Sequence, residues 1–322
     1  MKKKILSLVM ACVMLCSLCF AAIPASAEGD GMIIDKNDIP LRLYYDEEAS
    51  HDTEGKFENL DHVVGTGTGY ITTNVNDDWE RWSIPIGNGH FGANLFGRTN
   101  TERIQITDKT MQNPYASWGT SLGGLNNFSE TYIDFGHNNA QVTNYSRELD
   151  LKTAVSTVNY TYNGVNYSRE YFASYPDNAL VIKLSSSSEG ALSFVLRPTV
   201  PYEQEYAKTE GDRASKTGTV TSTVENGVGL INLIGKMGYY DVDYVGLYRV
   251  YTDGTGTVAA TTTTNADGDT DGTITVSGTK TAYIVVTLGT DYVLSPEIFT
   301  SSNSTKPTFN TDYDDAIAVV NG

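Results

Sequence analysis

Short strands separated by tight turns dominate this sequence and restrict its fold. Asn163-Gly164 lies between residues 157–162 and 165–171, in which apolar and polar side chains alternate. Alternation with a period of two predicts a strand with one buried face, and Asn-Gly predicts a two-residue hairpin turn because both residues adopt positive φ readily. The pattern recurs around three further pairs, which are Asn226-Gly227, Asp253-Gly254 and Asp271-Gly272. We therefore expect an all-β chain built as a large two-sheet antiparallel β-sandwich.

Apolar runs bounded by turn residues give the remaining expected elements. The expected strands are residues 41–45, 84–86, 93–96, 102–110, 179–184, 192–196, 216–224, 228–236, 244–251, 273–276 and 282–288. Residues 113–127 contain Pro114, Trp118 and three glycines, so we expect a loop there. Residues 314–320 begin with two aspartates and continue with apolar residues, which predicts the first turns of a helix.

A glycine-rich stretch at residues 79–97, WERWSIPIGNGHFGANLFG, is the most distinctive local feature. Dense glycine between two short strands predicts a tight turn at which the backbone approaches another group closely. The turn displays Asn88 and His90, and loops held by rigid strands commonly carry functional groups.

Two blocks of sequence resemble one known family. The first comprises Trp82, Pro85, residues 86–89, Gly92, Ala93, Phe96, Gly97, residues 102–105 and Thr110, and the second spans residues 145–185. In this order they resemble the N-terminal β domain of glycoside hydrolase family 95, which contains α-L-fucosidases and α-L-galactosidases. The resemblance extends over residues 77–293. It implies a large sandwich joined by linker helices to a catalytic (α/α)6 barrel that this chain does not include.

The N-terminus has the form of a secretory signal. Residues 1–27 combine three lysines, an apolar run and a small-residue end, Ala25-Ser26-Ala27. This favours a cleaved signal over a membrane anchor and predicts a secreted or cell-surface protein. All three cysteines lie in this segment, so the mature domain must be stabilised by its core rather than by disulfides.

The chain after the signal divides into three expected segments, and its net charge is strongly negative. We expect a polar leader at residues 28–69, the sandwich at 70–300 and the start of a linker at 301–322. Loss of the three signal lysines changes the net charge from −17 to −20. Nucleic acid and anionic membranes are therefore poor partners, because both attract basic proteins. We expect no cofactor and no resident metal.

No pair of acids stands out as catalytic. The candidates for catalytic carboxylates are the acids around the glycine-rich turn, Asp77, Asp78, Glu80, Glu102 and Asp108. We interpret them as solvated turn acids, or as a strand-end glutamate paired with Arg81 or Arg103, because exposed acids are the norm. The resemblance implies that the acid and base lie in the barrel, so no catalytic residue is expected in this chain.

The residues predicted to form the substrate-binding site are His90, Asn88 and Trp82. The resemblance implies that the turn reaches over a sugar pocket, so we expect His90 to hydrogen-bond a sugar hydroxyl while Asn88 shapes the turn. A purely structural histidine is the alternative. Trp79, Trp82 and Trp118 are interpreted mainly as packing residues, with Trp82 the one most suited to face the barrel.

Residues 267–272 imitate the beginning of a calcium loop. The twelfth position of such a loop should be a glutamate, but Gly278 occupies it. We therefore favour a hairpin turn over a calcium site.

The leading hypothesis is the sandwich portion of a secreted, inverting α-L-fucosidase that acts on terminal fucose of oligosaccharides or polysaccharides. The fragment alone should be inactive. An α-L-galactosidase of the same family is an alternative, since the two sugars differ at one substituent. A free-standing carbohydrate-binding or adhesion module, with an exposed row of aromatics, is another. A relative from the neighbouring phosphorylase clan is the third, although the motifs favour the hydrolase.

Overall fold

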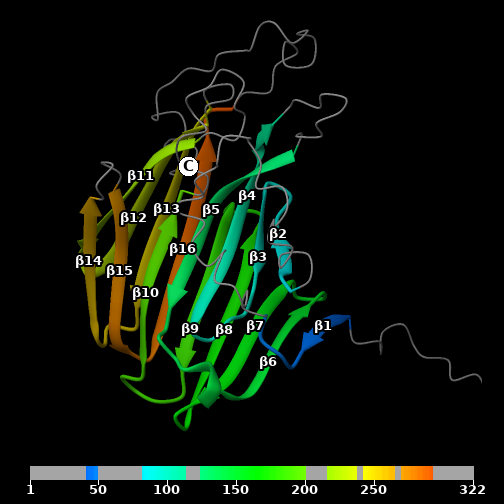
Figure 1. Cartoon of the computed structure of the whole chain (residues 1–322), viewed down its shortest axis with the longest axis vertical. Coiled ribbons are helices and arrows are strands. Elements are labelled where there is room, and N and C mark those ends of the chain that lie inside the picture. The colour runs from blue at the N-terminus through cyan, green and yellow to red at the C-terminus, as the bar shows by residue number, and fades with distance from the viewer. Residues whose placement is uncertain are drawn as a thin grey trace, which may run out of the picture. The chain divides into compact units, whose positions relative to one another are not determined.

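Two antiparallel sheets face each other in the computed structural model, which describes residues 41–49, 82–113, 124–200, 216–237, 242–264 and 270–292. The contacts divide the chain into Met1–Leu41 and Arg42–Gly322, and every element below lies in the second unit. The two layers of strands are visible in Figure 1. The described residues contain strands and one short 3-10 helix, η2 (Asn139–Gln141), so the all-β sandwich prediction is confirmed.

Among the described residues, one sheet has nine strands and the other seven. The nine-stranded sheet runs in the order β1 (Arg42–Tyr45), β6 (Thr143–Asp150), β7 (Val155–Tyr162), β8 (Val165–Ser174), β9 (Ala179–Ser186), β16 (Thr281–Thr290), β13 (Val242–Thr252), β12 (Val228–Met237), β11 (Lys216–Glu225). The seven-stranded sheet runs in the order β14 (Thr257–Thr264), β15 (Thr270–Thr279), β10 (Leu192–Thr199), β5 (Gly124–Asp134), β4 (Thr101–Asn113), β3 (Phe91–Leu95), β2 (Ile84–Gly87).

The core forms where the inward faces of the two sheets meet. Ile182 and Leu184 on β9 are fully buried, as are Ile104 and Ile106 on β4 of the other sheet. In each pair the residue between them is less buried, as the two-residue period of a strand requires. Burial of one such side chain contributes about 1.5–3 kcal/mol, so these alternating residues provide most of the stability.

The Asn-Gly hairpin at residues 163–164 is confirmed. Asn163 has φ 49° and Gly164 φ 78°, and Tyr162 pairs directly with Val165. Asn226 and Gly227 repeat this geometry between β11 and β12, with φ values of 51° and 81°. The turn residues therefore set the register of both hairpins.

Two sequence expectations about loops and turns differ from the structure. The loop expected at residues 113–127 is strand at both ends, because β4 continues to Asn113 and β5 begins at Gly124. Asp271-Gly272, expected to be a turn, lies within β15, where Gly272 pairs with Thr262. Strand pairing across the sheet outweighs the local turn tendency at both places. Residues 265–269, which include the first three residues of the calcium-like motif, lie outside the described residues, as do the signal and the expected helix at 314–320.

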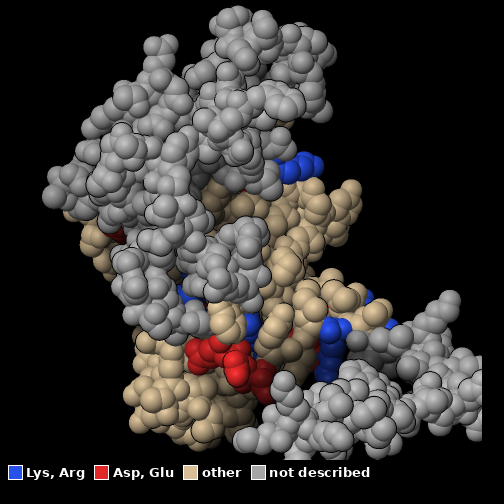
Figure 2. All heavy atoms as spheres, turned by 45° about the vertical axis from the view of Figure 1, so that its right-hand side comes forward, with Lys and Arg blue, Asp and Glu red and all other residues tan. Residues whose placement is uncertain are grey.

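Figure 2 shows how charged side chains are distributed over one face of the described residues. On the face shown in Figure 2, most of the described surface is uncharged, acidic side chains gather in one compact group, and basic side chains stand apart from one another. Within the described segments, no helix has the length and apolar character needed to cross a bilayer. The described part of this face thus offers no broad basic area of the kind that binds nucleic acid.

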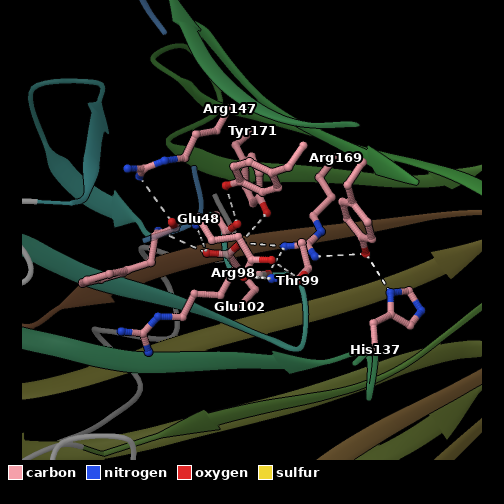
Figure 3. Close-up of polar contacts among 12 residues, drawn as sticks. Glu48, Arg98, Thr99, Glu102, His137, Arg147, Arg169 and Tyr171 are labelled. Carbon is pink, nitrogen blue, oxygen red and sulfur yellow. Dashed lines mark hydrogen bonds and ion pairs between the residues drawn. The ribbon is translucent and has the colours of Figure 1, made fainter. Parts of the chain in front are cut away.

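A buried ion pair joins the two sheets near the glycine-rich segment (Figure 3). Glu102 of β4 accepts a hydrogen bond from Arg169 Nη1 of β8 at 2.7 Å and one from the Tyr171 hydroxyl at 3.2 Å. Its other oxygen accepts from the backbone N–H groups of Phe96 (3.1 Å) and Gly97 (2.8 Å). Burial raises the pKa of the Glu102 carboxyl, and the Arg169 charge opposes that shift. Four donors therefore stabilise one fully buried carboxylate.

The interpretation of Glu102 as a strand-end acid paired with Arg81 or Arg103 is wrong. Arg103 points to the opposite face of β4 and pairs with Glu130 of β5 at 2.9 Å. Arg81 lies outside the described residues. Glu102 is buried rather than exposed because side chains alternate along a strand, and Glu102 therefore shares its face with Ile104 and Ile106.

A second buried arginine gathers three separate segments. Arg147 of β6 donates to the carbonyl oxygens of Glu47 (3.2 Å), Phe96 (3.3 Å) and Trp82. These carbonyls lie after β1, after β3 and just before β2. Arg147 therefore positions the entry into the glycine-rich segment.

Replacing Glu102 should destabilise the domain strongly. Glu102→Gln leaves the Arg169 charge buried without a counter-charge, which costs about 3–5 kcal/mol when a buried pair is broken. Glu189→Gln is the matched control, because its pair with Lys280 (2.7 Å) is exposed to solvent, where screening leaves it little net effect on stability. Urea unfolding of both variants measures the difference, and equal losses would contradict a sheet-joining role.

Gly97 should tolerate no side chain. It has φ 73°, and a Cβ there would lie 2.7 Å from the Tyr145 hydroxyl oxygen and 2.9 Å from Arg147 Cδ. Gly164, with φ 78°, has no atom within 4 Å of a Cβ. Both alanine variants carry the backbone strain of about 1–3 kcal/mol, but only Gly97→Ala adds the clash. Thermal unfolding should therefore show the larger loss for Gly97→Ala, and equal melting temperatures would refute the close packing.

Candidate functional site

The candidate site is the turn between β2 and β3, which Asn88 shapes. The Asn88 side-chain oxygen accepts from the backbone N–H groups of His90 (2.9 Å) and Phe91 (3.0 Å). The Asn88 backbone N–H also donates to the carbonyl of Phe91 at 3.2 Å. Gly89 completes the turn with φ 85°. An asparagine that binds its own backbone in this way is a recognised turn former, and the geometry agrees with the role expected for it.

Asn88 also connects the turn to the other sheet. Its Nδ2 donates to the carbonyl of Ser174 at 2.9 Å and to the side chain of Asn178 at 3.0 Å. Both partners flank the connection between β8 and β9 of the nine-stranded sheet. Since both ends of the Asn88 amide are engaged within the protein, its effect on a ligand is exerted through the shape of the turn.

His90 projects from this turn beside a buried carboxylate. The His90 side chain is 30% exposed, and its Nε2 lies 3.3 Å from Asp108 Oδ2. Asp108 is fully buried, and its other oxygen accepts from the Thr110 N–H (2.7 Å) and hydroxyl (2.5 Å). Within the described part of the chain, His90 Nδ1 has no hydrogen-bond partner, so it can serve a ligand as donor or acceptor according to its tautomer.

The prediction of Asp108 as a solvated turn acid is wrong. Asp108 continues the inward face of β4 beyond Ile104 and Ile106, so it lies at the end of the buried stripe. The other three acids considered as catalytic candidates, Asp77, Asp78 and Glu80, lie outside the described residues.

Polar contacts continue from Asp108 across the sandwich. The Thr110 hydroxyl lies 2.6 Å from that of Thr290 at the end of β16. The next residue, Asp291, accepts from the backbone N–H of Asp243 at 3.0 Å. Burial, together with the neighbouring Asp243 charge, raises the pKa of Asp291 to about 6. Sequence reasoning missed this group, because Thr290 and Asp291 look like an ordinary polar end to an apolar strand.

Trp82 lies just before β2, half-buried. Its carbonyl oxygen accepts from Arg147, so its backbone is fixed, while Trp79 and Trp118 lie outside the described residues. Tyr175 was missed as a site candidate. It is 79% exposed on the β8–β9 connection that Asn88 contacts, and its place inside the second matched block was the available signal.

Chemically, the described residues of this arrangement can bind hydroxyl groups, and neither of the two buried acids among them is exposed as a catalytic acid or base would be. Glu102 and Asp108 are both buried and hydrogen-bonded within the protein. An inverting glycosidase places its two carboxyl groups about 6.5–9.5 Å apart on either side of the bond it breaks. The described groups that reach the surface here include the His90 imidazole, the Tyr175 ring and the exposed Asp177 carboxylate, which suit hydrogen bonding to a ligand.

Replacing Asp291 should change the pH dependence of stability. An acid whose pKa is raised on folding, here to about 6, favours the folded state while protonated, and this contribution is lost as pH rises through that value. Asp291→Asn should therefore gain in melting temperature relative to the natural chain above about pH 6, and lose that advantage near pH 4. Asp271→Asn, at an exposed position, controls for the loss of one charge. A pH-independent difference would contradict the assignment.

Two individual proteins with similarity to this chain are a sequence relative and a solved structure. The chain is 32% identical over 149 residues to "Alpha-L-fucosidase 2" of Arabidopsis thaliana, which covers 35% of this chain and 17% of that protein. It therefore spans less than a fifth of this relative. Among solved structures, it is similar to a kojibiose phosphorylase described from the human microbiome, with a TM-score of 0.45 and 14% identity over 88% of this chain and 35% of that one.

The family comparison covers more of the chain. The model for "Glycosyl hydrolase family 65, N-terminal domain" matches residues 115–295, more than half of the 322 residues. The expected resemblance to family 95 is thereby supported at the level of a glycoside hydrolase-related N-terminal domain. On this match, together with the two-sheet sandwich, the chain belongs to the family of glycosyl hydrolase family 65 N-terminal domains.

Proposed function

We propose that this chain is the β-sandwich portion of an exported glycosidase that releases terminal α-L-fucose from oligosaccharides or polysaccharides with inversion. The proposal takes the fucosidase activity from the 32% identity to the named fucosidase and from the two sequence blocks described above. It assigns bond cleavage to a helical barrel outside this chain. Residues 1–27 would direct export.

The geometry of His90 carries the proposal. A partly exposed imidazole stands on a turn that Asn88 braces against both sheets, with a buried carboxylate 3.3 Å behind it. A positioning group needs its orientation fixed before the ligand arrives, since ordering it afterwards costs binding energy. His90 is thus well suited to hold a sugar hydroxyl against a partner domain that performs the chemistry.

The burial of the two acids agrees with the assignment of catalysis to the barrel. Glu102 joins the two sheets and Asp108 is buried against Thr110 and His90, so the proposal draws the general acid and base from the barrel. Trp82, next to β2, would face the same domain.

Replacing His90 tests the positioning role in the full-length protein. His90→Ala should lower kcat/KM for 4-nitrophenyl α-L-fucoside about tenfold, the equivalent of one hydrogen bond of about 1.4 kcal/mol, with little change in melting temperature. Asn88→Ala is the matched variant in the same turn, and it should lower the melting temperature because four internal hydrogen bonds are lost. Unchanged kinetics in His90→Ala would dismiss the role.

The division between domains makes a separate prediction. The purified 322-residue chain should release no fucose, whereas the full-length protein should release it without inorganic phosphate. Detectable release by the chain alone would contradict the assignment of the acid and base to the barrel. A strict requirement for phosphate would indicate phosphorolysis instead, and a faster reaction with the matching α-L-galactoside would favour the alternative sugar.

A further inference from the structure

The outer face of the nine-stranded sheet carries a hollow lined by neutral polar groups. The hollow, here called the polar recess, has a volume of about 600 Å³ and lies over β7, β8 and β9. The side chains that form it from the outer face are Asn159, Thr161, Asn166, Ser168, Ser185 and Ser187. These residues alternate along their strands with inward-facing ones such as Tyr160 and Tyr167, which places them opposite the core.

Cross-strand pairing arranges these groups in order. Asn159 pairs with Ser168, and Ser168 pairs with Ser185, so three neighbouring strands present their polar groups side by side. Asn166 is fixed by a hydrogen bond from Thr161 at 2.8 Å and by its N–H to the Ser187 hydroxyl at 3.0 Å. Among the residues that the structure describes, no Lys, Arg, Asp or Glu lines the recess. It therefore presents amide and hydroxyl groups, which donate and accept hydrogen bonds without a net charge.

Two exposed tyrosines stand in the adjacent row of the same face. Tyr283 of β16 and Tyr251 of β13 are direct cross-strand partners and are 41% and 40% exposed. Tyr283 also pairs with Lys183 of β9, which is two residues from Ser185 in the recess. Two residues along a strand span about 7 Å and neighbouring strands lie about 4.8 Å apart, so the tyrosines and the recess form one continuous surface.

The charged residues in this row neutralise each other. Lys183 Nζ lies 2.6 Å from the carboxylate of Glu170 on β8, its direct strand partner. Among the described residues, the one further cation beside the tyrosine pair is Arg249 of β13, which donates to the Thr287 hydroxyl at 3.4 Å. A single arginine is not the broad basic area that a polyanion or nucleic acid needs. The apolar part of the surface is the pair of tyrosine rings, with Phe172 of β8, 38% exposed, one outward position beyond Glu170. Three separate rings beside polar groups make a small patch for protein docking.

We propose that this surface, formed by the polar recess and the Tyr251–Tyr283 pair, binds a neutral oligosaccharide chain. A neutral sugar has hydroxyl groups that match amides and hydroxyls, and C–H faces that pack on aromatic rings with a polar edge. The row from β8 to β13 crosses three strand spacings, or about 14 Å, which suits several linked sugars better than one. The inference does not rest on the proposed fucosidase activity, because it concerns binding by residues on the other sheet from His90.

Affinity gel electrophoresis of the purified chain tests this directly. The probes are four neutral polysaccharides, namely fucosylated xyloglucan, arabinan, galactomannan and mixed-linkage β-glucan, with polygalacturonate as the anionic comparison. We expect retardation by at least one neutral polymer and none by polygalacturonate. Tyr251→Ala/Tyr283→Ala should weaken retardation at least tenfold, and Asn159→Ala/Asn166→Ala should weaken it as well, each with a cooperative unfolding transition that shows an intact fold.

Tyr175→Ala is the matched control, because Tyr175 is more exposed, at 79%, but lies on the β8–β9 connection beside Asn88. It should bind the polymers that carry no fucose as the natural chain does. The inference is overturned if no neutral polymer retards the chain, if polygalacturonate binds best, or if Tyr175→Ala abolishes binding while Tyr251→Ala/Tyr283→Ala retains it. Loss of fucosidase activity in the full-length protein would leave these results unchanged, so the two proposals fail separately.

Discussion

The ion pair between Glu102 and Arg169 is the contact on which the arrangement of the two sheets depends. Removing two charges from water costs several kcal/mol per ion, and their attraction offsets this only where further hydrogen bonds complete the site. Here Tyr171 and the N–H groups of Phe96 and Gly97 complete it on one side. Arg169 in turn donates to the carbonyl of Arg98 at 2.7 Å and lies over the ring of Phe135. Such a site admits one arrangement of β4 against β8.

This pair also fixes register. A slip of one residue in β4 would turn Glu102 outward and bring Arg103 into the core, because successive side chains point to opposite faces. Ile104 and Ile106 alone would specify the inward face, and the ion pair adds a penalty for every alternative. The segment after β3 is held in place by the same carboxylate, so the geometry of the glycine-rich region follows from the core.

Much of the fold could be predicted from local sequence, because the information is local. Alternation around Asn163-Gly164 specifies a hairpin by itself, and so does Asn226-Gly227. The buried charges could not be predicted, because Glu102 and Asp108 look the same in sequence as acids on a solvated strand. Only pairing with residues such as Arg169, far along the chain, makes their burial possible. The Asn88 turn was found from its glycines, whereas the Tyr251–Tyr283 neighbours depend on strand register that no single segment encodes.

Arg147 has a consequence for where this domain can be divided. The carbonyls it gathers belong to Glu47, Phe96 and Trp82, all of which precede the segment matched by the family model, residues 115–295. β2, β3 and β4, which supply one edge of the seven-stranded sheet and the carboxylate of the central ion pair, precede it too. A fragment cut at the start of the conserved match would keep the guanidinium groups and lose their acceptors. The autonomous folding unit is therefore longer than the stretch by which relatives are recognised, and it reaches back at least to β1.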